Sequence, residues 1–191
     1  MSVFFVIFIV VLFMNSMKFI IVGKAASGKD WLQKMMVERG YVPMRQYTTR
    51  DKRDNESGDE YHFVNETEFK EMEKSGKFVS VNFYRIGWYG ISMDEFMSCN
   101  VAILSPANVK DIFSKYPELR SICRIIYLDI PVDVRRERLS MRYEGKPGDD
   151  NEIRIMNDEK DFAGFKDYDV KLCDECEIST FINNLTPFQK W

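Results

Sequence analysis

Short apolar runs alternate with segments of helical periodicity along most of this 191-residue chain. The runs at 18–22, 101–104 and 123–128 are rich in β-branched residues, as expected of buried parallel strands. Apolar residues recur at helical spacing after the first run, a helix is expected over 108–115 after the second, and Pro131 opens one after the third. Strands that alternate with helices predict an α/β fold with a parallel sheet core.

The middle of the chain departs from this alternation. Residues 78–84 alternate between apolar and polar, and 86–91 supply a partner for an antiparallel hairpin. Asn65 and Glu68 form a capping-box pattern, which predicts a helix from Glu66 to Gly76. We therefore expect an antiparallel insertion in the parallel fold. Towards the C-terminus the pattern predicts a loop over 143–151, a helix from Glu152, a strand over 169–172 and a helix near Thr180.

Residues 23–30 carry the strongest chemical signal. They follow G-x-x-x-x-G-K-[ST], in which backbone N–H groups and a lysine hold the phosphates of a nucleotide. A strand precedes the motif and a helix follows it, which is the required context; the alternative is a chance glycine-rich turn between two core elements. The motif predicts ATP binding by Gly23, Ala25, Ala26, Ser27, Gly28, Lys29 and Asp30.

Asp30 stands where the motif has a Ser or Thr whose hydroxyl normally holds Mg²⁺. A carboxylate next to a phosphate is unfavourable unless a cation lies between them. We therefore interpret Asp30 as a candidate metal ligand, acting directly or through a water molecule.

Length, charge and cysteine content limit the number of domains and the classes of ligand that the sequence suggests. The length suits one domain, and a net charge of −3 gives no indication of a nucleic-acid-binding surface. The four cysteines do not resemble a disulfide framework, and Cys173 and Cys176 lack the second pair that a zinc site requires. We expect reduced thiols in a cytoplasmic protein, with zinc as the alternative.

The apolar segment 3–14 is short for a membrane span and lacks the features of a signal peptide. Met17 opens the strand that leads into the phosphate motif. We expect residues 1–16 to be an extension outside a domain that spans 17–191, with Met17 as the natural start. A membrane-associated N-terminal segment is the alternative.

A second constellation follows the phosphate motif at 47–64. Arg50 and Arg53 can form charge-assisted pairs with a second phosphate, and Tyr61 can donate its hydroxyl. The sequence T-T-R-x-x-R, the acidic stretch with its glycine, and Y-H-F-V resemble the guanylate kinase family, as does the Tyr89-Gly90 pair downstream. The resemblance extends over roughly 18–171.

This resemblance implies a P-loop kinase fold with a monophosphate-binding insertion at about 45–92 and a small lid at about 140–155. It implies transfer of the terminal phosphate of ATP to a nucleoside monophosphate, with Mg²⁺. Arg50, Arg53, Tyr61 and Tyr89 would hold the phosphate of the acceptor. The catalytic residues would be Lys29, Arg50, Arg138, Arg142 and Arg154. For the last three, the alternative is a basic helix face that balances nearby acids.

The positions that read guanine in the family differ here. Gln46 and Ser80 occupy the places of a Ser and a Glu, and could read a base through neutral hydrogen bonds. The segment 104–108 also lacks the acids of the family. The first expectation is (d)GMP as acceptor, and the alternatives are another or modified (deoxy)nucleotide, a non-catalytic module that binds phosphopeptides, or a P-loop kinase for another metabolite. A monomer or a homodimer is expected.

Overall fold

The computed structural model describes residues 17–53, 56–84, 87–142 and 149–188. Its central sheet is made of four parallel strands in the order β6-β1-β7-β8. In this sheet Ile20 is in register with Ala102 of β6 and with Ile125 of β7. The strands are β1 (Lys18–Gly23), β6 (Val101–Ile103), β7 (Cys123–Leu128) and β8 (Val170–Leu172). The parallel core predicted from the apolar runs is therefore confirmed.

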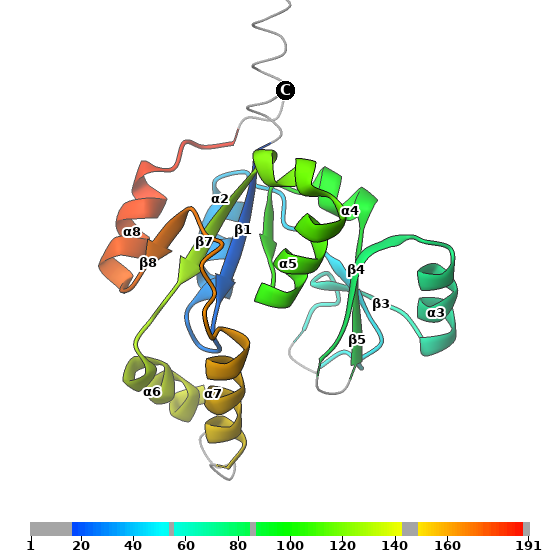
Figure 1. The fold of residues 1–191 in the computed structure, drawn as a ribbon. Coiled ribbons are helices and arrows are strands. Elements are labelled where there is room, and N and C mark those ends of the chain that lie inside the picture. The colour runs from blue at the N-terminus through cyan, green and yellow to red at the C-terminus, as the bar shows by residue number, and fades with distance from the viewer. Residues whose placement is uncertain (1–16, 54–55, 85–86, 143–148, 189–191) are drawn as a thin grey trace, which may run out of the picture.

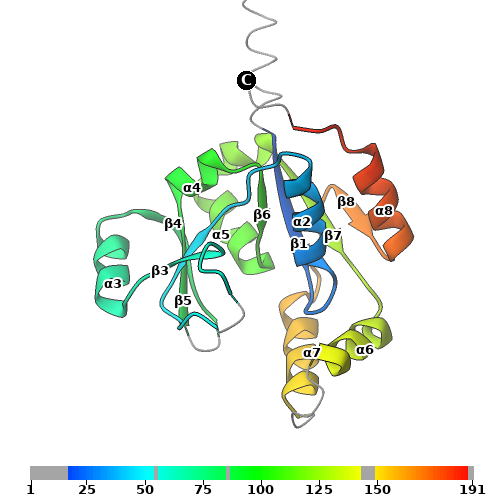
Figure 2. The same ribbon diagram turned by 180° about the vertical axis from the view of Figure 1, so that it is seen from behind.

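Helices cover both faces of this sheet (Figures 1 and 2). Because successive side chains of a strand point to opposite faces, Ile21 packs with Leu32 and Ile178 on one side. Ile20 packs with Val109 in a second apolar cluster on the other side. The first side is covered by α2 (Lys29–Glu38) and α8 (Glu175–Asn184), and the second by α5 (Pro106–Lys115) and the 3₁₀ helix η1 (Pro117–Ile122).

A second sheet lies beside the core, in the order β3-β2-β5-β4. Its β2–β3 pair is parallel, whereas β2–β5 and β4–β5 are antiparallel, which confirms the hairpin. Helix α3 covers its outer edge, and α4 leads from it back to the central sheet (Figure 2). The elements are β2 (Gln46–Thr48), β3 (Tyr61–Phe63), α3 (Glu66–Lys74), β4 (Phe78–Tyr84), β5 (Gly87–Ser92) and α4 (Met93–Ser98).

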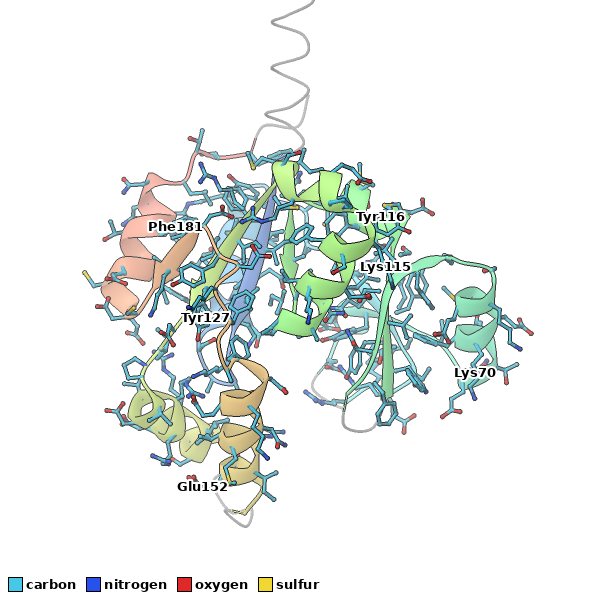
Figure 3. The ribbon with its side chains drawn as sticks, in the orientation of Figure 1. Lys70, Lys115, Tyr116, Tyr127, Glu152 and Phe181 are labelled. Carbon is cyan, nitrogen blue, oxygen red and sulfur yellow. The ribbon has the colours of Figure 1, made fainter. Side chains whose placement is uncertain are left out.

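The pair α6 (Val132–Arg142) and α7 (Asp149–Asp161) projects from the carboxyl ends of the central strands (Figure 1). Figure 3 shows Glu152 on the part of α7 far from the sheet, where its carboxylate pairs with Arg136 at 2.7 Å. These helices occupy the region expected to form the lid. The junction at 143–148 lies outside the described residues.

Three helices differ from the sequence prediction, and side-chain capping accounts for two of the differences. The Ser105 hydroxyl accepts from the Asn108 amide in a capping box, so α5 begins at Pro106 and not at 108. Ser92 likewise caps α4, a helix that the sequence analysis did not predict. The loop prediction for 143–151 is wrong over 149–151, which belong to α7.

Residues 1–16, including the apolar segment at 3–14, lie outside the described part of the chain. Within that part, no helix combines the length and apolar character needed to cross a membrane.

Candidate active site

The phosphate motif forms a tight loop between β1 and α2. Gly28 has a φ of 95° and Ala26 a φ of 59°, so two residues of the turn are left-handed. A Cβ atom on Gly23 would lie 2.5 Å from Ser27 Oγ, so only glycine fits where the loop folds back on itself. Lys29 Nζ donates to the Lys24 carbonyl oxygen at 2.9 Å across the turn. The loop thus places its N–H groups and Lys29 at the N-terminus of α2, where an anion is favoured.

Ser27 adds a hydroxyl within this loop. Its residue is fully buried, and its Oγ has no hydrogen-bond partner among the described residues. A buried hydroxyl without a partner is costly in a finished protein interior. The loop therefore has unused hydrogen-bonding capacity, which fits a ligand rich in acceptor oxygens.

Side chains from the lid helices contact the same loop. Asp158 Oδ2 of α7 accepts from the Ala25 amide at 2.6 Å. Arg138 Nη1 of α6 donates to the Ala26 carbonyl oxygen at 3.1 Å, and its Nη2 donates to Glu175 at 2.6 Å. The phosphate loop is consequently held from α6 and α7 as well as by its own turn.

Ion pairs add further contacts between the phosphate loop and the helices α6 and α7. Lys24 of the loop pairs with Glu159 at 2.7 Å, and Arg135 pairs with the other oxygen of the same carboxylate at 2.8 Å. Arg135 is only 1% exposed, and its Nε donates to the Ile130 carbonyl oxygen at 3.0 Å. The hydrogen bond from Lys24 lowers the pKa of Glu159, which stays charged beside its two cations.

The second candidate phosphate site is built on β2, β3 and β5. Arg50 follows β2, is 5% exposed, and lies over the ring of Tyr61 with 4.8 Å to its centroid. The rings of Tyr61 and Tyr89 meet edge to face at 5.9 Å. Arg50 donates to the Glu56 carboxylate with both Nη atoms, at 2.8 Å for Nη1, and this interaction raises the pKa of the guanidinium. The structure therefore brings together three of the four residues predicted to bind the acceptor phosphate.

Electrostatics link the two candidate sites. Burial raises the pKa of Tyr61; Tyr89 and the Asp30 carboxylate reinforce the increase, and Arg50 opposes it. The influence of Asp30 means that the last residue of the phosphate motif lies within electrostatic range of the acceptor cluster. The two candidate sites, which are distant in sequence, are thus linked electrostatically.

The remaining arginines are placed differently. The Arg53 side chain is exposed, and its backbone N–H donates to Glu56 at 3.0 Å. Arg138 contacts the phosphate loop, as expected of a lid-side arginine, but also pairs with an acid of α8. Arg154 is a partly exposed residue of α7. The side chain of Arg142 lies outside the described part of the structure.

The predicted base-reading positions form a neutral polar cluster. Ser80 is 1% exposed and accepts from Asn108 Nδ2 at 3.1 Å. Gln46 Nε2 donates to the Ile103 carbonyl oxygen at 3.1 Å, at the carboxyl end of β6. Ser105 Oγ completes the cluster through a bond to Asn108 Oδ1 at 2.6 Å. Asn108 supplies the polar group that lies next to Ser80, in place of the carboxylates that the family resemblance led us to expect at this strand end.

Asp30 is the residue predicted to bind Mg²⁺. Asp30 is exposed in the first turn of α2. Mg²⁺ often takes one or two carboxylates and completes its shell with phosphate oxygens and water. Among the described residues, no group of three or more His, Cys, Asp or Glu side chains could hold a metal ion, the region around Cys173 and Cys176 included. Asp30 therefore fits a Mg²⁺ ion that is shared with the phosphates of a nucleotide.

Four further residues escaped the sequence analysis: Glu56, Asn108, Arg135 and Asp158. Glu56 lies in the acidic stretch that the resemblance identified, so its pairing with Arg50 could have been considered. Arg135 shares its helix with Arg136, Arg138 and Arg142, so the sequence does not single it out. The contact of Asp158 with Ala25 joins residues 133 positions apart, and no local pattern marks it.

Gly87 positions Arg50, and we expect its substitution to destabilise the insertion. A Cβ atom at this position would lie 2.8 Å from the Arg50 backbone nitrogen and 2.9 Å from its Cβ. Because the obstacle is backbone, Gly87→Ala should lower the free energy of unfolding by about 1–3 kcal/mol in urea denaturation. The exposed Lys70→Ala on α3 (Figure 3) serves as control and should change it by less than about 0.5 kcal/mol. Equal stabilities of wild type and Gly87→Ala would contradict this packing.

The Arg50–Glu56 pair should make stability depend on pH. The hydrogen bond from Arg50 lowers the pKa of Glu56 in the folded protein. Its contribution is present above the ordinary pKa of a glutamate and is lost as pH falls through the lowered value. Glu56→Gln should therefore be less stable than wild type near pH 7, by about 1–2 kcal/mol, with the difference shrinking towards pH 3. Thermal unfolding at several pH values measures this, and a gap that widens in acid would contradict it.

A parallel sheet with a glycine-rich loop at the end of its first strand, an inserted second sheet and a projecting helix pair corresponds to the P-loop kinase fold. Residues 15–100 match the family model described as guanylate kinase. Over this part of the chain the protein is similar to the guanylate kinase family.

A solved structure agrees with this fold. A guanylate kinase from Anaplasma phagocytophilum is similar with a TM-score of 0.63 and 16% identity, over 88% of this chain and 82% of that chain. A shikimate kinase from Bacteroides thetaiotaomicron has a TM-score of 0.48 and 16% identity, over 87% of this chain and 94% of that chain. No curated protein matches the sequence.

Proposed function

We propose that this protein is a nucleoside monophosphate kinase that transfers the terminal phosphoryl group of ATP to the phosphate of a nucleoside monophosphate. The observation that carries the proposal is the presence of two candidate anion-binding groups: the loop at 23–30, with left-handed Ala26 and Gly28, and the buried Arg50 stacked on Tyr61. A kinase of this class needs two phosphate sites within reach of each other. The match of residues 15–100 to the guanylate kinase family model supports the same reaction.

Each group has a role that its chemistry suits. The loop amides and Lys29 bind the phosphates of ATP, and Asp30 shares Mg²⁺ with them. Arg50, with Tyr61, Tyr89 and Arg53, binds the acceptor phosphate. An oxygen of that phosphate attacks the terminal phosphorus of ATP, the bond from this phosphorus to the bridging oxygen breaks, and ADP leaves. The attacking oxygen is already anionic, so no general base is needed, and Arg138, Arg142 and Arg154 neutralise the charge in transit.

The family favours GMP or dGMP as the acceptor. The neutral cluster of Ser80, Asn108 and Gln46 supports an alternative with another or a modified base. Guanine presents N–H donors, and a carboxylate accepts from them more strongly than a hydroxyl or an amide. Ser80 is also enclosed and already bonded to Asn108. A neutral polar cluster of this kind suits a base that offers an acceptor to a neutral donor.

A coupled assay of ADP release tests the proposal, with ATP, Mg²⁺ and a panel of ribo- and deoxynucleoside monophosphates. Turnover with one acceptor identifies the base and the sugar. If folded protein gives no turnover with any of them but binds a phosphopeptide, the chain is a non-catalytic module of the same family. Turnover with a different phosphorylated metabolite alone would identify a P-loop kinase of other specificity.

Asp30→Ser should alter the requirement for Mg²⁺. The substitution restores the hydroxyl of the common motif and removes a carboxylate ligand. If Asp30 holds the ion, the Mg²⁺ concentration for half-maximal turnover should change by about tenfold, the equivalent of about 1.4 kcal/mol. Glu38→Ser, at the other end of α2, is the control for loss of a charge and should leave the Mg²⁺ titration unchanged. Identical titrations for Asp30→Ser and wild type would show that Asp30 has no metal role.

A further inference from the structure

One carboxylate contacts the phosphate loop although the expected ligand is itself an anion. Asp158 Oδ2 accepts from the Ala25 amide at 2.6 Å, and the residue is 8% exposed. Ala25 is the third residue of the motif, and N–H groups of such a loop are donors for phosphate oxygens. A carboxylate oxygen and a phosphate oxygen are equivalent acceptors for such a donor. Asp158 therefore uses a hydrogen bond of the kind that the loop offers to a nucleotide.

Other partners of Asp158 hold it less firmly. Arg135 Nη1 lies 3.6 Å from Asp158 Oδ2, too far for a hydrogen bond, and this Nη1 has no hydrogen-bond partner in the described part of the chain. The shorter bonds of Arg135 go to Glu159 and to the Ile130 carbonyl oxygen. Asp158 is thus hydrogen-bonded to the Ala25 amide, and Lys29 and Arg135 both act on its charge.

The loop itself has room for further acceptors. Ser27 is fully buried and its Oγ has no partner among the described residues. The loop therefore combines an occupied amide at Ala25 with an unused hydroxyl two residues later. Asp158 satisfies only part of the hydrogen-bonding capacity that a polyphosphate could fill.

We propose that Asp158 is a placeholder for phosphate, which occupies the Ala25 amide before nucleotide binds and gives it up when ATP arrives. The inference rests on the proposed function, because it assumes that residues 23–30 bind the phosphates of ATP. Bound phosphates next to Asp158 would repel its carboxylate. Since Asp158 belongs to α7, its release would free one contact between the lid pair and the loop at the moment of binding.

The opposite role for Asp158 is that of a strut. In that case the carboxylate would support the loop from outside the path of the phosphates, and its bond to Ala25 would persist in the complex. The two roles predict effects of opposite sign on nucleotide affinity. A placeholder competes with ATP, so its neutralisation tightens binding, whereas a strut shapes the loop, so its neutralisation weakens binding.

Calorimetric titration with ADP and with ATP and Mg²⁺ separates these roles. Asp158→Asn keeps the volume of the side chain but removes the charge, and charge-assisted hydrogen bonds are about twice as strong as neutral ones. We expect it to bind both nucleotides about tenfold more tightly than wild type, a change of about 1.4 kcal/mol. Asp161→Asn is the matched control: it removes an exposed charge from the same helix and should change the Kd by less than about twofold.

A second measurement avoids any dependence on the folding of Asp158→Asn. In the wild-type protein, the ¹³Cγ resonance of Asp158 should shift when ADP is added, because the carboxylate loses the Ala25 amide. Unchanged or weaker binding by folded Asp158→Asn, or a resonance that stays in place at saturation, overturns the placeholder role alone. Failure of wild type and both variants to bind ADP or ATP overturns the phosphate-loop assignment and this inference with it.

Discussion

Lys29→Ala should lower kcat by about 10²–10³, the range seen when one donor that stabilises transition-state charge is removed. Lys29 is the first residue of α2 and lies on the inside of the phosphate turn, where its Nζ reaches the Lys24 carbonyl oxygen. In an ATP complex the same ammonium group would face the outer phosphates. Its loss removes positive charge where negative charge is redistributed in the reaction, so turnover should fall at saturating substrate.

The control for this prediction is Lys34→Ala, which removes an exposed lysine from the same helix and should leave kcat within about twofold of wild type. Both variants should unfold at about the temperature of wild type. A Lys29→Ala enzyme with full activity would show that residues 23–30 do not bind the transferring phosphates. Activity lost together with cooperative unfolding would instead indicate damage to the fold.

Arg50→Lys should raise the KM for the acceptor strongly and leave the KM for ATP near its wild-type value. Lysine keeps the charge but loses the planar fork that binds two oxygens and the ring stacking over Tyr61. Two charge-assisted hydrogen bonds contribute about 1.5–3 kcal/mol each, so loss of one or two should lower kcat/KM for the acceptor by about 10–10⁴-fold. Steady-state kinetics with each substrate varied in turn measures this split.

Arg50 also holds the insertion together, so the kinetic effect needs a structural control. Glu56→Gln perturbs the same buried pair but keeps the guanidinium, and it should therefore lower stability more than it raises the acceptor KM. Arg45→Lys makes the same exchange just before β2, outside the Arg50 cluster, and should have little effect on either. If Arg50→Lys and Glu56→Gln change stability and KM in parallel, Arg50 acts through the fold and not on the acceptor.

Both candidate phosphate sites are paired with a carboxylate of the protein itself. Arg50 is bonded to Glu56, and the Ala25 amide is bonded to Asp158. A cation or a buried N–H without a partner would be costly in the absence of ligand. Internal carboxylates remove that cost in the free protein, and under the proposed function each would be exchanged for phosphate oxygens when substrate binds. Such an arrangement makes substrate affinity depend on acids that would not themselves contact the substrate in the complex.

The sequence alone determined the elements that depend on short-range pattern. The apolar runs at 18–22 and 123–128 became β1 and β7, because a buried parallel strand requires continuous apolar residues. Glycine at 23 and 28 predicted the phosphate loop, since the turn leaves no room for a Cβ atom at one position and requires a positive φ at the other. The order of the phosphate motif and the T-T-R segment indicated the family, which the comparisons support.

Only the tertiary structure decided which groups meet across long separations. Asp158 contacts Ala25, Asn108 contacts Ser80, and Asp30 influences Tyr61, although nothing in the local sequence marks these pairs. Such contacts follow from the packing of α7 against the loop and of α5 against β4, and packing depends on the whole chain. Periodicity and turn chemistry act over a few residues, so they predict elements well, whereas the charge balance of a site is set by residues that the fold brings together.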